Sequence, residues 1–92
     1  MVKIVDYLPR DYMMMFSPIM LRILALPFLA WENVPCKRRQ YVALLAHELT
    51  HMIDWIIVYR CDAERWNRSE VQEEYIANLV QDVILRCLLV KL

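Results

Sequence analysis

Two histidines four residues apart, with a glutamate beside the first, are the residues of this chain best suited to chemistry. Residues 47–51 read His-Glu-Leu-Thr-His. On an α-helix, positions i and i+4 share one face, so His47 and His51 can direct two imidazole nitrogens at one point. Such a pair suits Zn²⁺, which binds histidine nitrogens at about 2.0–2.1 Å. Glu48 lies about 100° around the helix from His47, where it can accept a proton from a metal-activated water.

The histidine pair needs a third ligand, because catalytic zinc usually has three protein ligands and a water. Residues 52–73 are enough for one helix to end and a second helix to return, which would bring Glu74 to the two imidazoles. Glu73 is the rival ligand, but it lies about 100° away around the same helix. We prefer Glu74, because only Glu74 fits a Glu-x-x-Ala-Asn frame.

Three further residues are expected to support the ligands. Ala77, one turn after Glu74, is small enough to let the two helices approach closely. Asn78 could hold a ligating histidine by its other ring nitrogen. Asp54 is at position i+3 from His51 and could support it by a hydrogen bond, although a polar side chain at the helix edge is the simpler interpretation.

The combined pattern resembles a known group of enzymes. His-Glu-Leu-Thr-His followed by Glu-Tyr-Ile-Ala-Asn at residues 74–78 resembles the gluzincins, which carry HExxH on one helix and a glutamate ligand on the next. The Glu-x-x-Ala-Asn form is similar to the ImmA/IrrE-type metallopeptidases and to short HExxH proteins encoded by phages and prophages. The resemblance covers residues 41–85, and residues 1–40 resemble no family.

The resemblance implies a zinc metallopeptidase that acts on a protein or peptide substrate. By resemblance, His47, His51 and Glu74 would bind Zn²⁺ and Glu48 would be the general base. The metzincin extension is excluded, because Asp54 and Ile57 stand where its glycine and third ligand would be.

No residue is placed by spacing to stabilise the oxyanion of the reaction. Tyr41, Tyr59 and Tyr75 are the candidates near the motif. The absence of a clear oxyanion group favours a second hypothesis of another class, a non-catalytic zinc-binding interaction protein. In that protein, Glu48→Gln would change nothing.

Composition limits the other function classes. The net charge is zero, which argues against a nucleic-acid-binding protein, and the absence of glycine excludes glycine loops that cradle phosphate. Three cysteines without CxxC spacing predict reduced thiols and a cytoplasmic protein, in the host cytoplasm if a phage encodes it. The hydrophobic content of 60% predicts an apolar surface that a second copy or a partner could cover.

The elements that would position the site form a single α+β domain over residues 1–92, mainly helical, with a small N-terminal β element. The apolar stretch 12–31 is not expected to span a membrane, because two prolines and an arginine interrupt it. Within this N-terminal part we predict a strand at 2–8, and a short helix from a cap at Asp11 to Phe16. Residues 19–26 suit either a buried strand or a helix, and we expect them to form the edge strand along which a substrate would lie.

Two helices complete the predicted domain. The first covers residues 37–59 and is apolar around most of its circumference, which places it in the middle of the domain. The second follows a polar link at 61–68 and begins at Ser69, because Ser69 and Gln72 have the spacing of a capping box. Trp55 and Trp66 are expected to pack at the core or its rim.

Overall fold

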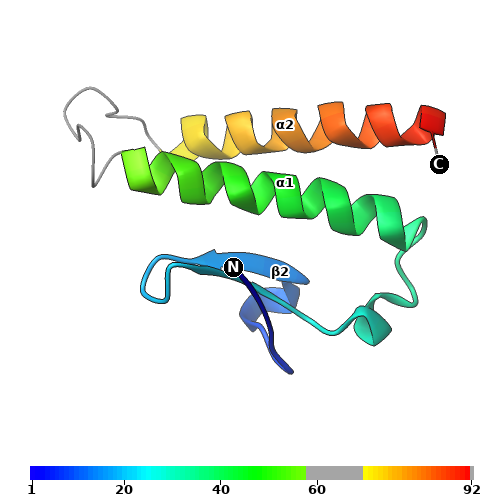
Figure 1. Cartoon of the computed structure of the whole chain (residues 1–92), viewed down its shortest axis with the longest axis horizontal. Coiled ribbons are helices and arrows are strands. Elements are labelled where there is room, and N and C mark those ends of the chain that lie inside the picture. Colours follow the sequence, from blue (N-terminus) through cyan, green and yellow to red (C-terminus); the bar gives the residue numbers. More distant parts are fainter. Residues whose placement is uncertain (58–69, 92) are drawn as a thin grey trace.

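A β-sheet and two helices stack in three layers, with the HExxH helix in the middle (Figure 1). The computed structural model describes residues 1–57 and 70–91. Helix α1 (Lys37–Ile56) lies between the sheet and α2 (Glu70–Lys91), which runs antiparallel beside it. The predicted α+β, mainly helical fold is therefore confirmed. The middle position of α1 explains why its apolar residues cover most of its circumference.

The sheet of the described part has three strands in the order β1-β3-β2. β1 (Val2–Ile4) pairs in parallel with the central strand β3 (Arg22–Ala25). β2 (Met14–Ser17) pairs with β3 on its other side in the antiparallel direction, and forms an edge of the sheet. The strand predicted at 2–8 is present as the shorter β1.

Two local predictions for the N-terminal part are wrong. Residues 11–16 do not form a helix capped by Asp11, because only a short 3-10 helix, Pro9–Asp11, precedes β2. Pairing with β3 overrides the helical preference of the methionines. Residues 19–26 do not form an edge strand either, because β3 bonds to strands on both sides and has no free edge for a substrate.

Turns in this glycine-free chain are made by residues that are strained in the conformation they adopt. Arg10, Asp11, Leu21 and Cys36 all have φ between 50° and 58°. The left-handed region costs a residue with a Cβ roughly 1–2 kcal/mol. Leu21 closes the connection from β2 to β3, and Cys36 immediately precedes α1. The fold therefore carries local strain at its connections.

The hydrophobic core lies between the sheet and α1. Trp31, in the 3-10 helix Phe28–Trp31, is 1% exposed and packs on Tyr41 of α1 with ring centroids 5.2 Å apart. The other fully buried members of this cluster come from the strands, and apolar residues of α1 cover them. They are Met14, Ile23 and Ala25, with Leu44, Leu45 and Leu49 against them.

The predicted helix boundaries agree with the structure where it describes them. α1 begins at Lys37 as expected, and α2 begins at Glu70, directly after the predicted cap. Ser69 itself, the predicted link at 61–68 with Cys61 and Trp66, and the predicted helix end at 58–59 lie outside the described residues. Across residues 1–57 and 70–91, no helix combines the length and hydropathy needed to cross a membrane.

Candidate metal centre

Three of the predicted ligands converge on one point between α1 and α2. The Nε2 atoms of His47 and His51 are 3.2 Å apart. Glu74 places Oε1 at 2.9 Å from His47 Nε2 and Oε2 at 3.1 Å from His51 Nε2. In a tetrahedral zinc site, ligand atoms about 2.0–2.1 Å from the metal are roughly 3.3 Å apart. The observed separations are close to that value, so small outward shifts would accommodate an ion.

Small residues at the contact of the two helices make this convergence possible. Ala77 of α2 is 0% exposed, as is Ala43, which lies one turn before His47 on the same face of α1. Because neither has a side chain beyond Cβ, the helix axes can approach closely on this face. Glu74 lies one turn before Ala77, so its carboxylate reaches across to the imidazoles. Ala77 therefore has the place that the sequence predicted for it.

The cluster is open on one side. The His47 side chain is 9% exposed and the His51 side chain 20%, whereas the Glu74 side chain is 55% exposed. The histidines are held in the interior while the third ligand faces solvent, which leaves room for water or a substrate to approach. Among the described residues, Glu73 does not join this cluster.

Glu48 lies beside the histidines in a buried position. Its Oε1 atom is 4.0 Å from His47 Nε2. Its Oε2 atom accepts a hydrogen bond of 2.9 Å from the backbone N–H of Phe16 in β2. Burial raises the pKa of the Glu48 carboxyl, and the Phe16 N–H and His47 partly oppose this shift while Glu74 adds to it. A carboxyl with a raised pKa beside a group of potential metal ligands is suited to accept and release a proton.

Phe16 is a site residue that sequence reasoning missed. Its contribution is a backbone group, and residue type carries no information about which backbone N–H meets a distant carboxylate. The contact spans 32 positions of the chain and depends on the packing of the sheet on α1. Only knowledge of the register of β2 could have indicated it.

The expected supporting residues are placed differently from the ligands. Asn78 is exposed, and the buried Nδ1 of His47 has no hydrogen-bond partner among the described residues. A hydrogen bond from Asn78 to a ligating histidine therefore stays a prediction. Asp54, expected at the helix edge, is buried with 8% exposure. It does not belong to the cluster of potential ligands.

The structure does not place Tyr41 or Tyr75 as a donor to the oxyanion. Tyr41 packs against Phe28 and Trp31 in the aromatic part of the core. Tyr75 is 69% exposed. Tyr59 lies outside the described residues. Trp55 contacts Phe16 edge to face with centroids 6.3 Å apart, which is the packing role expected for it.

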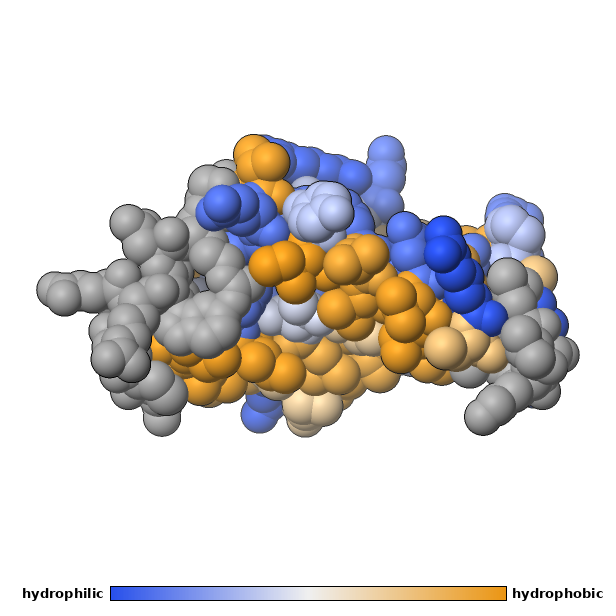
Figure 2. Space-filling model, turned by 90° about the horizontal axis from the view of Figure 1, so that it is seen from above, coloured by the Kyte–Doolittle hydropathy of each residue, from blue (hydrophilic) through white to orange (hydrophobic). Residues whose placement is uncertain are grey.

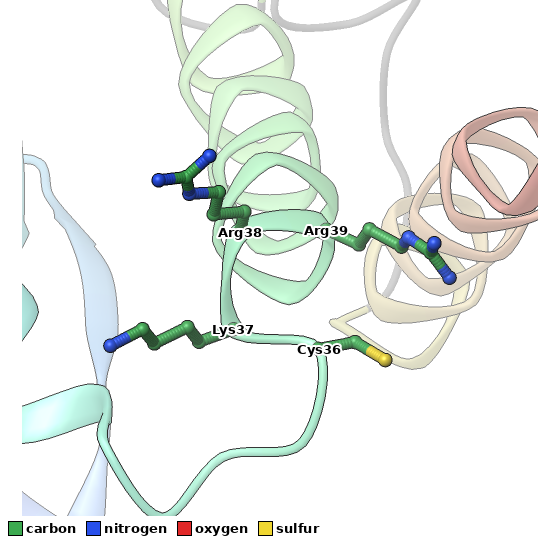
Figure 3. Close-up of a pocket in the computed structure, with 4 residues that line it drawn as sticks. All are labelled: Cys36, Lys37, Arg38 and Arg39. Carbon is green, nitrogen blue, oxygen red and sulfur yellow. The ribbon is translucent and has the colours of Figure 1, made fainter. Parts of the chain in front are cut away.

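A cavity of about 370 Å³ at the start of α1 is a weaker candidate for a binding site. It is lined by Cys36, Lys37, Arg38 and Arg39, whose side chains diverge rather than meet (Figure 3). The Lys37 ammonium lies 4.9 Å from the centre of the Phe28 ring, in a cation–π contact. Because the basic groups do not converge, they do not form an anion site.

Comparison of the chain with protein-family models, with curated proteins and with solved structures finds no match. The chemistry of the cluster itself is therefore the basis on which a function can be proposed.

Proposed function

We propose that this protein is a zinc-dependent metallopeptidase. The observation that supports this proposal is the convergence of His47, His51 and Glu74 beside the buried carboxylate of Glu48. Two imidazoles and one carboxylate are a donor set found in catalytic zinc sites. The Glu74 carboxylate reaches the Nε2 atoms of both histidines, as expected if the three side chains share a cation. Polar side chains that were merely part of an exposed helix surface would instead point into water.

In the proposed reaction, each residue has a separate task. His47, His51 and Glu74 would hold the ion. A bound zinc ion would supply Lewis acidity, which acidifies water and polarises a peptide carbonyl. Glu48 would take the proton of the attacking water on Oε1 and pass it to the leaving amine. The open side at Glu74 would admit the peptide. We also propose that the protein acts in the cytoplasm, is encoded by a phage or prophage, and does not bind nucleic acid.

A non-catalytic zinc protein is the second candidate, and a specific observation favours it. Seen from the side of α2, the molecule presents many apolar side chains to solvent (Figure 2). Four of them follow one another at intervals of one turn along α2, and all are at least half exposed. They are Val71, Tyr75, Leu79 and Val83. Such a surface suits a protein whose zinc holds two helices together for binding a partner or a second copy.

Metal content and peptidase activity of Glu48→Gln test the proposal. In a peptidase, the variant keeps about one zinc per chain and loses activity by roughly 10²–10⁴-fold, because only the proton acceptor is removed. Elemental mass spectrometry and cleavage of a quenched-fluorescent peptide library measure the two quantities.

Glu73→Gln is the matched control and should keep both zinc and activity. A parent protein that binds no zinc would contradict the proposal. Zinc binding without activity in the parent would favour the second candidate.

A further inference from the structure

The backbone N–H of Phe16 points away from its own sheet. In the β2–β3 register, Phe16 lies opposite Ile23, and the neighbouring bond runs from Leu26 N–H to Met13 C=O at 3.0 Å. Because the bonded positions of an antiparallel pair alternate, residues 14 and 16 direct their N–H groups outward. Ile23 donates its own N–H to Met1 C=O at 3.1 Å on the far side of β3. The Phe16 N–H is therefore not used by the sheet.

This outward N–H meets Glu48. A buried carboxylate without a donor would be costly, and Phe16 supplies one at 2.9 Å to Oε2. With Oε2 held by the strand, Oε1 is the oxygen that faces His47, at 4.0 Å. The Phe16 ring contacts Trp55, two turns after Glu48 on α1, so strand and helix are joined at two points. A packing contact between the same strand and the same helix therefore accompanies the hydrogen bond.

We infer that the backbone N–H of Phe16 positions Glu48 for catalysis, with Oε2 fixed on β2 and Oε1 directed toward the ligand cluster. This inference rests on the proposed function. It assigns a task to a peptide group on an element far from the motif in sequence. It also means that an extended peptide cannot pair with this N–H while Glu48 holds it.

Replacing one N–H by oxygen tests the inference. Incorporation of phenyllactate at position 16 turns the amide into an ester and keeps the ring. We expect zinc stoichiometry and the circular dichroism spectrum to be unchanged, and kcat to fall roughly 10–100-fold with KM within about twofold, as for loss of a group that orients a site residue. Phe16→Leu separates the two contributions, because it removes the ring that contacts Trp55 and keeps the N–H. Its kcat should fall less than that of the ester, since the donor to Glu48 is still present.

A second readout does not require peptidase activity. Acetohydroxamic acid is a zinc chelator that loses its N–OH proton on binding. Glu48 would accept that proton, so the affinity of the chelator reports whether Glu48 is correctly placed. Calorimetry should show weaker hydroxamate binding in the ester and in Glu48→Gln, and a smaller loss of affinity in Phe16→Leu.

The outcomes separate this inference from the proposed function. An ester variant with parental kcat and parental hydroxamate affinity would overturn the inference and leave the peptidase proposal standing. An ester variant that does not fold would also overturn it, because the N–H would then be structural. A parent that binds no zinc would contradict both proposals together. If the parent binds zinc but is inactive, the peptidase proposal fails, and the hydroxamate affinity of the ester then shows whether the Phe16 N–H positions Glu48.

Discussion

The two sides of α1 differ in what they bury. On the side of the sheet, Met14, Ile23 and Trp31 are at most 2% exposed and form an apolar core. On the side of α2, Ala77 is the one apolar residue of α2 that is fully buried among the residues described. The buried groups on this side include the imidazole of His47. One side is stabilised by apolar burial. The other side holds the polar cluster of His47, His51 and Glu74, which we propose to be completed by a shared cation.

The contact of α1 with the sheet and its contact with α2 should therefore respond to different conditions. Burial of apolar area does not depend on a ligand. A metal bound by residues from two helices adds its binding free energy to the contact between them. The sheet and α1 should therefore form a stable unit without metal, and α2 should be the part whose docking zinc strengthens.

The largest loss of stability is expected from Trp31→Ala. Removal of a fully buried tryptophan costs about 3–5 kcal/mol of the free energy of unfolding. The loss falls on the sheet side, so zinc should raise the melting temperature of the variant without restoring that of the parent. Urea unfolding followed by circular dichroism measures the change. A cost below about 1 kcal/mol would show that the aromatic cluster is not the main core.

Removal of zinc is expected to have the next largest effect. At a free zinc concentration of 100 times Kd, binding stabilises by about 2.7 kcal/mol. For a chain of this size this corresponds to a melting temperature roughly 10–20 °C higher than with chelator. Hydrogen exchange should become faster in α2 and remain unchanged in β3. Glu74→Ala should abolish the shift, whereas Glu73→Ala should preserve it. An equal loss of protection from hydrogen exchange in α2 and β3 would contradict the proposed difference between the two sides of α1.

Ala77→Leu should affect the α2 side selectively. A larger side chain at a 0% exposed position costs about 1–3 kcal/mol, because the helices must separate to admit it. Separation moves Glu74 away from the histidines, so zinc affinity should fall as well. Competition with a chromophoric chelator measures the affinity. Val83→Leu, on the exposed face of α2, is the control and should change neither quantity.

Leu21→Gly should give the smallest effect, and in the opposite direction. The φ of Leu21 is 52° and the residue is 37% exposed, so glycine relieves strain and little packing is lost. The strain relieved at Leu21 is roughly 1–2 kcal/mol. It exceeds the entropic cost of glycine, which is roughly 0.5–1 kcal/mol. Chemical denaturation should therefore show a slightly more stable protein. Met20→Gly is the control, since Met20 has no positive φ, and it should be destabilising.

The sequence predicted most about the cluster, because the relevant rules are local. The spacing of His47 and His51 on a helix fixes their common face, and Glu74 with Ala77 follows from the same periodicity on the next helix. Patterning also predicted the central position of α1. These features depend on neighbours within one or two turns, so they can be derived before any tertiary contact is known.

Features that depend on long-range pairing were missed. Residues 14–17 have no alternation strong enough to distinguish a strand from a helix, and pairing with β3 decides between them. The central place of β3 follows from the order of strands, which local pattern does not encode. The contact from Phe16 to Glu48 depends on both. The strain at Leu21 could not be predicted either, because leucine is not a residue type that indicates a left-handed turn.

The Nδ1 atom of His47 offers a position for protein engineering. It is buried and has no hydrogen-bond partner among the residues that the structure describes. Histidine ligands are ordinarily oriented by an acceptor at this second nitrogen, and such acceptors are worth about 10–100-fold in metal affinity or activity. An acceptor introduced beside Nδ1 should therefore increase the zinc affinity of the proposed centre without any change to the ligands themselves.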